Sequence, residues 1–403
     1  MSYGEESIRL HRASRGKVAT LLKMPLETLE DLALAYTPGV AAVSLAIAHD
    51  KSEVYALTGK GNTVAVVTDG SAVLGLGNVG PEAALPVMEG KAILFKSLGD
   101  IDAVPICLGT QDTQAIIDTV RYLAPTFGGI NLEDIAAPRC FDVEDGLQDL
   151  GIPVFHDDQH GTAIVTLAAL VNALKVTGRR LEETAIVIAG AGAAGIAVAR
   201  LLRVFGAPNM TLVDSREIIH KGRRDLTPVK AGILEFTNPD DRRGGLAEAL
   251  RGADVFIGLS VAGIVDQAMV RSMGKGPIVF AMANPVSEIA PELALEAGAA
   301  VVGTGRSDYA NQINNCLAFP GVFRGALDVR ATRITREMML AAARALADLV
   351  PRPIPTAILP SPLDRSVVAA IAAAVAEAWE MRAGLPVGVA ATGEAQRITS
   401  PSA

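Results

Sequence analysis

The segment AIVIAGAGAAG, residues 185–195, carries the strongest fold signal in this chain. It starts with an apolar stretch that predicts a strand, passes through a glycine-rich turn and ends at the start of a helix. Gly190, Gly192 and Gly195 form the pattern G-x-G-x-x-G. In a dinucleotide-binding unit the first glycine permits the tight turn, the second lets the backbone approach a pyrophosphate, and the third lets helix and strand pack closely. The sequence therefore predicts a Rossmann-type dinucleotide site, with a glycine turn that only packs as the alternative.

The acidic residue Asp214 ends the next predicted strand, MTLVD, residues 210–214. A carboxylate at about this distance from the glycine turn holds the ribose hydroxyls of NAD, and it would repel the 2′-phosphate of NADP. Lys221, Arg223 and Arg224 follow soon after and could instead cradle that phosphate. We therefore expect NAD as the cofactor, with NADP as the alternative.

Apolar strands and helices alternate on both sides of this unit, which is typical of α/β proteins. Half of the residues are hydrophobic and only 4% are aromatic, as in aliphatic parallel strands covered by Ala-rich helices. We predict a Rossmann-type doubly wound parallel sheet plus an α/β substrate domain completed by C-terminal helices. The predicted boundaries are 1–156 for the substrate domain, 157–314 for the dinucleotide domain, 315–383 for helices that pack on the first domain, and 384–403 for a disordered tail.

The composition argues against several classes of protein. A formal net charge of -8 is unsuited to a nucleic-acid surface, which needs a basic patch. No uninterrupted apolar run approaches the ~20 residues of a membrane span, and the N-terminus lacks the apolar centre of a signal peptide. Cys107, Cys140 and Cys316 have no metal-ligand spacing, which is typical of a reduced protein. We expect a cytoplasmic protein that acts on a small molecule, without nucleic acid or membrane.

Two acidic pairs precede the glycine turn, Glu133-Asp134 and Asp157-Asp158. Each pair follows an apolar predicted strand, so both can meet at the carboxyl edge of one sheet. Carboxylates in that place suit Mg²⁺ or Mn²⁺, which prefer oxygen ligands. As alternatives, the first pair could be a solvated helix start, and Asp158 could cap a helix predicted to begin near Gly161.

His156 and His160 flank the second acidic pair in the string HDDQH, residues 156–160. The zinc-protease motif H-E-x-x-H needs both histidines on one helix face and a glutamate in second place. Here Asp157 is second and a predicted strand ends beside it. We therefore do not expect zinc.

Lys91 lies in an otherwise apolar predicted helix, residues 84–99, and Tyr36 lies in the string AYTPGVA, residues 35–41. A lysine in apolar surroundings usually extends its ammonium group to solvent. If Lys91 is instead buried beside a divalent cation, both effects lower its pKa and make it usable as a base.

Together these strings resemble the malic enzymes, in particular their short prokaryotic form. The strings that carry the resemblance run in the family's order between Tyr36 and Gly321: AYTPGVA, VAVVTDGSAVLGLGNVGPEAALPVMEGKA, INLEDIA, VFHDDQHGTA, GAGAAG, AMANPVSE and INNCLAFPG. The resemblance implies oxidative decarboxylation of malate to pyruvate and CO₂, dependent on a metal ion and on NAD or NADP.

The resemblance also implies a role for each matching residue. Lys91 matches the base that removes the substrate hydroxyl proton, Tyr36 the acid that protonates enolpyruvate, and Asp157 the carboxylate that orients the lysine. The metal ligands would be Glu133, Asp134 and Asp158. Thr162 and Asn284 would lie at the cofactor, and Asn284 and Asn315 would hold the substrate.

One departure from the family bears on substrate binding. Larger malic enzymes carry an arginine for the substrate carboxylate in the segment that here contains Ser71, Ala72 and Val73. The carboxylate would then be met by the asparagines and by backbone N–H groups.

Two other functions stay open from the residues alone. A metal-dependent hydrolase built on HDDQH would leave the glycine turn unused, and a non-catalytic dinucleotide sensor would not need Lys91 or Tyr36.

The resemblance further implies a homodimer in which Tyr36 acts in the active site of the neighbouring subunit. The stiff turn Thr37-Pro38-Gly39 could carry Tyr36 across a two-fold interface.

Overall fold

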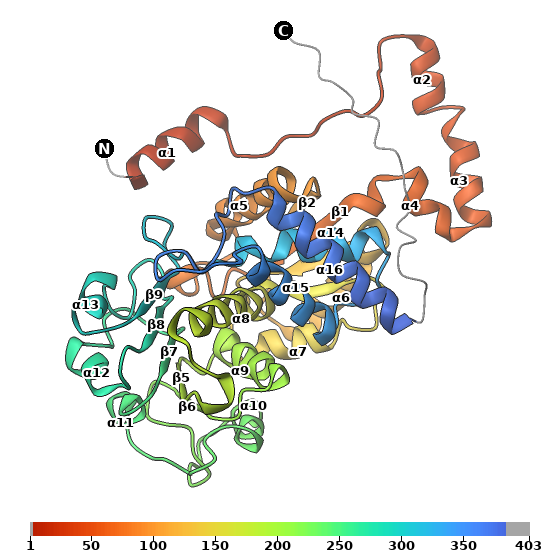
Figure 1. The fold of residues 1–403 in the computed structure, drawn as a ribbon. Coiled ribbons are helices and arrows are strands. Elements are labelled where there is room, and N and C mark those ends of the chain that lie inside the picture. Colours follow the sequence, from red (N-terminus) through yellow and green to blue (C-terminus); the bar gives the residue numbers. More distant parts are fainter. Residues whose placement is uncertain (1–2, 384–403) are drawn as a thin grey trace.

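The computed structural model describes residues 3–383, which contain two parallel β-sheets (Figure 1). The tail that we expect to be disordered, residues 384–403, lies outside the described residues.

The first sheet has the strand order β2-β1-β3-β4. Its strands are β1 (Thr63–Thr68), β2 (Asp102–Cys107), β3 (Gly129–Leu132) and β4 (Val154–His156). The β-branched run of β1 suits a central strand, and five of its six residues are buried. Because the chain leaves β1 toward β2 on one side and reaches β3 on the other, the carboxyl ends of β1 and β3 border a topological switch point.

The second sheet has the order β6-β5-β7-β8-β9. Its strands are β5 (Ile186–Ala189), β6 (Met210–Val213), β7 (Val255–Gly258), β8 (Ile278–Ala281) and β9 (Val301–Thr304). All five are buried along their length and pair in parallel, and the switch point lies between β5 and β7. The predicted α/β class with a Rossmann-type doubly wound sheet is confirmed.

Helices complete the first sheet from both ends of the chain. Those that follow its strands are α5 (Pro81–Gly99), α6 (Thr113–Leu123) and α7 (Arg139–Asp145). From the C-terminal part, α14 (Phe319–Asp328) packs on α5, where the Phe319 ring lies 4.6 Å from that of Phe95. The last helix, α16 (Ser366–Ala383), packs in turn on α14.

The long helix α8 (Asp157–Thr177) contacts strands of both sheets, β4 and β9. The other helices of this part of the chain are α9 (Ala193–Phe205), α10 (Pro228–Gly232), α11 (Leu246–Leu250), α12 (Gln267–Ser272), α13 (Pro291–Glu296) and α15 (Arg336–Asp348). The sequence predicted that α8 begins near Gly161, and this was wrong. The helix begins at Asp157, directly after β4, because carboxylates are favourable in the first turn, where backbone N–H groups are free.

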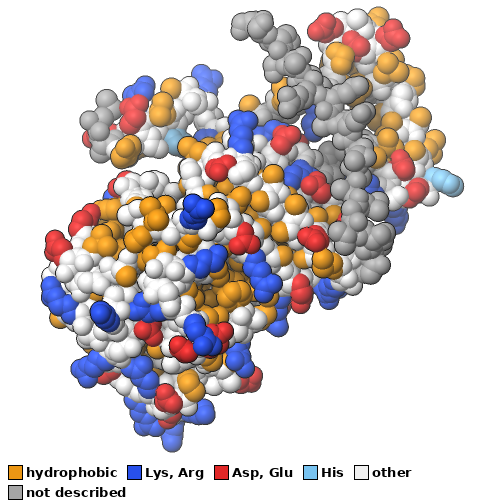
Figure 2. All heavy atoms as spheres, in the orientation of Figure 1, with side chains coloured by type: hydrophobic (Ala, Val, Ile, Leu, Met, Phe, Trp, Pro, Cys, Tyr) orange, Lys and Arg blue, Asp and Glu red, His pale blue; other side chains and the backbone are white. Residues whose placement is uncertain are grey.

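An N-terminal arm formed by α1 (Tyr3–Ser14), α2 (Leu29–Ala35) and α3 (Val40–His49) projects from the two sheets and joins them through α4 (Val54–Leu57) (Figure 1). None of the described residues of α1, α2 and α3 is buried. Leu29, Leu34 and Leu45 are all more than 60% exposed, and Figure 2 shows hydrophobic side chains along the projecting part. The arm therefore presents an apolar surface that this chain does not cover.

Two stretches of the described chain are long and apolar enough to cross a membrane by length and composition, residues 29–49 and 157–177. The second is α8, which is largely buried in the core. The first is divided into α2 and α3 by the turn at Thr37-Pro38-Gly39.

Candidate active site

A cavity of about 970 Å³ opens between the two sheets. Its walls come from α5, the loops after β1, β3, β7 and β8, the first turns of α8 and α9, and the segment before α14. Ser7 and His11 of α1 and the nearby Lys17 also line it. Eight of the predicted site residues line it: Lys91, Glu133, Asp134, Asp158, Thr162, Gly192, Asn284 and Asn315. Residues predicted from six separate segments of the sequence thus meet in one place.

The three predicted metal ligands lie together at the carboxyl edge of the first sheet. Glu133 and Asp134 follow β3, and Asp158 lies in the first turn of α8. One carboxylate oxygen from each lies within 4.8 Å of the others. The backbone N–H of Asp134 donates to Asp158 Oδ2 at 2.7 Å, which fixes the two segments to each other. Three converging carboxylates match the oxygen ligands that Mg²⁺ or Mn²⁺ requires.

Lys91 lies at the centre of this charge. It is only 8% exposed, so the alternative of an ammonium group in solvent is wrong. Its Nζ lies 3.0 Å from Glu133 Oε1 and donates a hydrogen bond to Asp157 Oδ2. Asp157 is fully buried behind the cavity wall, where it can orient the lysine.

The expected lowering of the Lys91 pKa is not found in the protein without metal. Burial lowers this pKa, but the negative charges of Asp157, Glu133 and Asp158 outweigh burial and raise it above its usual value. Desolvation and the neighbouring carboxylates Asp158, Asp157 and Asp134 raise the pKa of Glu133, although Lys91 opposes them. The site therefore holds a surplus of buried negative charge that a divalent cation would balance.

Tyr36 does not join these residues within one chain. It follows α2 in the projecting arm, is 66% exposed, and is absent from the described residues that line the cavity. Within the described chain, Tyr36 therefore lies outside the candidate active site.

The glycine turn has the geometry that a dinucleotide requires. Gly190 has φ +104°, and a Cβ on Gly195 would lie 1.8 Å from the carbonyl oxygen of Gly190. Gly190 and Gly195 thus shape the turn, whereas Gly192 and the first residues of α9 face the cavity. The free N–H groups of this helix N-terminus suit phosphate oxygens.

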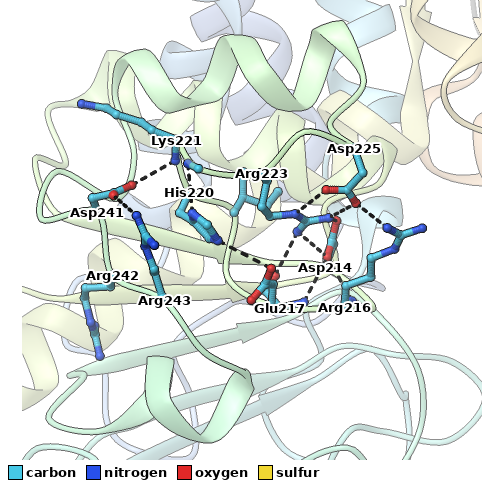
Figure 3. Close-up of polar contacts among 12 residues, drawn as sticks. Asp214, Arg216, Glu217, His220, Lys221, Arg223, Asp225, Asp241, Arg242 and Arg243 are labelled. Carbon is cyan, nitrogen blue, oxygen red and sulfur yellow. Dashed lines mark hydrogen bonds and ion pairs between the residues drawn. The ribbon is translucent and has the colours of Figure 1, made fainter.

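Asp214 is already saturated with hydrogen bonds (Figure 3). Arg223 donates to both of its carboxylate oxygens at 2.8 and 3.0 Å, and Lys230 donates to Oδ2 at 2.7 Å. Burial raises the Asp214 pKa, but the hydrogen bonds from Arg223 and Lys230 outweigh burial and hold it well below its usual range. Sequence reasoning named Arg223 but not Lys230, which comes near only because α10 folds back.

Sequence reasoning also missed Glu288, which is fully buried in the dinucleotide part of the chain. Its carboxylate accepts hydrogen bonds from the backbone N–H groups of Ser260 and Ala283, both at 3.0 Å. Ser260 and Ala283 line the cavity on the loops after β7 and β8. The only sequence signal was an acidic residue at the end of the apolar string AMANPVSE.

The histidines of HDDQH do not form a metal site. The one carboxylate, cysteine or histidine cluster with metal-binding spacing among residues 3–383 is Glu133, Asp134 and Asp158. His160 Nε2 instead forms a hydrogen bond of 2.8 Å with Glu144. The two histidines therefore give no support to a metal-dependent hydrolase built on HDDQH.

A Rossmann-type sheet beside an acidic cavity with a buried lysine defines a dinucleotide-dependent oxidoreductase. Residues 15–148 match the malic enzyme N-terminal domain, and residues 159–379 match the malic enzyme NAD binding domain. The chain belongs to the malic enzyme family.

Curated relatives and solved structures agree with this assignment. The chain is 56% identical to the bifunctional malic/malolactic enzyme of Bacillus subtilis, over 94% of this chain and 93% of that protein. It is 54% identical to the NAD-dependent malic enzyme of Geobacillus stearothermophilus (90% and 76%) and 49% identical to the NADP-dependent malic enzyme of Halomonas elongata (90% and 90%). The solved malic enzyme of Pyrococcus horikoshii superposes with a TM-score of 0.91 at 48% identity, covering 95% of this chain and 92% of that one.

Proposed function

We propose that this protein catalyses the oxidative decarboxylation of malate to pyruvate and CO₂ with reduction of NAD or NADP. The observation that carries the proposal is Lys91, held between Asp157 and Glu133 in a cavity that also contains the N-terminus of α9. Neither a hydrolase nor a dinucleotide sensor needs this arrangement.

Each site residue has a task in the proposed reaction. Lys91 takes the proton of the C2 hydroxyl as hydride passes to the nicotinamide, and Asp157 holds the lysine in place. Glu133, Asp134 and Asp158 would hold Mg²⁺ or Mn²⁺, which would polarise the C2 oxygen, stabilise the developing enolate and offset the charge that keeps Lys91 protonated. Tyr36 of a neighbouring subunit gives a proton to the enolpyruvate carbon after CO₂ leaves.

The substrate carboxylate is proposed to bind Asn284 and Asn315. Both asparagines line the cavity, and Ala72 lines it in the segment that carries an arginine in larger relatives. Arg139 lies beside the same segment, but its guanidinium donates to Asp69 Oδ2 and Ser71 Oγ, at 2.7 and 2.9 Å. Its charge is therefore engaged within the protein.

We propose NAD as the preferred cofactor, with NADP also accepted. Arg223 and Lys230 balance the charge of Asp214, so the repulsion expected for a 2′-phosphate is reduced. Relatives named for either cofactor match at comparable identity.

Replacement of Lys230 by methionine should lower kcat/KM for NADP more than for NAD. An equal effect on both would contradict a role for Lys230 at the 2′ position.

Absorbance of the reduced nicotinamide tests the activity. Purified protein with malate, Mn²⁺ and NAD should form reduced cofactor, and chelation of the metal should stop the reaction. No reduced cofactor with either NAD or NADP would contradict the proposal. We further propose a homodimer, which the uncovered apolar arm supports. We also propose a cytoplasmic location, which the three free cysteines support.

A further inference from the structure

A second cavity, of about 570 Å³, lies between α7, the first turns of α8, α9, α15 and the end of α16. None of the described residues that line it also lines the candidate active site. Its volume falls within the range of about 300–1,000 Å³ typical of small-molecule sites. In Figure 1 the wall helices α7 and α9 lie below α8, and α15 lies beside it. The proposed reaction uses no part of it.

The floor of this second cavity is built around the buried carboxylate of Glu144. The side chain of Gln159 donates to it at 3.0 Å, a hydrogen bond of 2.8 Å joins it to His160 Nε2, and the backbone N–H of His156 donates at 3.2 Å. Phe155 adds an apolar surface, its ring 5.5 Å from that of His160. The charge of Glu144 is thus satisfied within the protein, beside an aromatic wall.

Four arginines from separate elements line the same cavity: Arg200, Arg333, Arg336 and Arg382. All four are exposed, and none forms an ion pair or a hydrogen bond with another residue of the described range 3–383. The acidic groups of the lining, apart from Glu144, are Asp142, Asp145 and Glu337. Because Glu144 is bound to His160, the four arginines face three remaining carboxylates around this cavity.

We propose that this cavity binds a small phosphomonoester with an apolar body. The planar guanidinium group offers paired N–H donors that match phosphate oxygens, and several arginines around one opening suit the two negative charges of a phosphomonoester. The apolar body would lie beside Phe155 and Phe141, where the Arg200 guanidinium lies 5.9 Å from the Phe141 ring.

Occupation of the cavity would be felt at the metal ligands, a consequence that rests on the proposed function. His156, Gln159 and His160 bind Glu144, whereas Asp158 of the same HDDQH segment lines the candidate active site and the buried Asp157 contacts Lys91 there. A ligand that moves His160 or Glu144 therefore acts on the turn of α8 that carries both aspartates. Coupled sites of this kind typically change each other's affinity by roughly 5- to 150-fold.

Isothermal titration with phenyl phosphate tests the binding, on protein already saturated with NADH and Mn²⁺ so that the active-site cavity is filled. We expect saturable binding, weakened about tenfold or more in the double variant Arg200→Ala/Arg336→Ala because two charged hydrogen bonds are lost. Arg203→Ala is the matched control, since Arg203 is an exposed arginine of the same helix α9 that does not line the cavity. All three substituted arginines are exposed, so the variants should fold, which circular dichroism checks.

Equal affinity in wild type and the double variant, or no saturable binding, would overturn the site whatever the catalytic activity. The coupling between this cavity and the metal ligands is tested by a Mn²⁺ titration in which electron paramagnetic resonance measures the free ion. Phenyl phosphate should change the apparent Mn²⁺ affinity in wild type and not in the double variant. An unchanged Mn²⁺ affinity with phenyl phosphate bound would overturn the coupling.

Discussion

Neighbouring carboxylates determine the protonation of Lys91. Two carboxylates contact its ammonium group, and a third, Asp158, adds negative charge from nearby. The lysine is therefore protonated until that charge is offset, which ties its use as a base to the occupation of the carboxylate cluster.

Replacement of Lys91 by alanine should lower turnover by roughly 10²- to 10⁴-fold, because the general base is lost. Cofactor affinity should stay nearly unchanged, since the glycine turn lies on another element. Steady-state kinetics and an NADH binding titration measure the two effects. Turnover like that of wild type in folded variant protein would exclude Lys91 as the base.

The two adjacent aspartates of α8 should respond differently to substitution. Asp158→Ala should abolish metal-dependent activity, because only two of the three carboxylates would remain, too few to hold the cation. Asp157→Asn should cost only roughly 10- to 100-fold, as is typical of a residue that orients another ligand or base. The comparison is made at saturating Mn²⁺. Equal residual activity in the two variants would show that their assigned roles are wrong.

The lowered pKa of Asp214 should make the free energy of unfolding depend on pH. Its folded pKa lies below that of the unfolded chain, so its contribution is complete above about pH 4 and is lost as the pH falls through the folded pKa. Asp214→Asn should lower the free energy of unfolding by about 2 kcal/mol at pH 7, the value of a charged hydrogen bond. Denaturant melts of both proteins at several pH values measure the difference, which should shrink below about pH 4. A difference that grows on acidification would contradict this explanation.

At the scale of residues, the sequence predicted the carboxylates best. Glu133, Asp134, Asp157 and Asp158 follow strands of one parallel sheet, and strand ends meet by topology. Lys230 and Glu288 could not be predicted in this way. Lys230 binds the side chain of Asp214, and Glu288 binds backbone N–H groups on two loops. Only the folded chain brings these partners together.

At the scale of elements, Glu288 joins two loops that border the cofactor side of the cavity. A carboxylate accepts from both N–H groups, whereas a glutamine oxygen accepts from one and its NH₂ group faces the other. Glu288→Gln should therefore raise KM for the cofactor by about tenfold, while Mn²⁺ affinity stays unchanged. Glu292→Gln is the control, an exposed glutamate at the start of α13. An unchanged cofactor KM in Glu288→Gln would exclude this positioning role.

The strands and most helices were predictable from apolar periodicity, but the start of α8 was not. The polar string HDDQHG resembles a loop in sequence, and nothing in it shows that β4 passes into the helix without a turn. The consequence is functional, since the early start places Asp158 in the first turn, close to Glu133 and Asp134.

At the scale of the whole molecule, the arm formed by α1, α2 and α3 has no buried residue in its described part and needs a second surface to cover it. Its apolar side chains are exposed in the single chain, and Tyr36 lies away from Lys91. In the homodimer that we propose, a second copy of the chain covers the arm, and Tyr36 acts in the neighbouring active site. The sequence could suggest this arrangement only through its resemblance to known enzymes, because no pattern within one chain specifies the interface.

Complementation tests the dimer. Inactive Tyr36→Phe and Lys91→Ala proteins, mixed under conditions that exchange subunits, should form heterodimers in which one site carries both defects and the other carries neither. Activity should recover to up to about half of the wild-type value per heterodimer. With exchange shown by native mass spectrometry, no recovery would place Tyr36 in the active site of its own chain.

We propose that one and the same site oxidises malate and then decarboxylates the product. Malate labelled with carbon-13 in its C4 carboxyl tests both steps at once, with Mn²⁺ and NAD present. We expect one labelled CO₂ and one unlabelled pyruvate for each reduced nicotinamide, and in Lys91→Ala all three should form more slowly by the same roughly 10²- to 10⁴-fold factor. Reduced nicotinamide formed together with labelled oxaloacetate and without labelled CO₂ would contradict it.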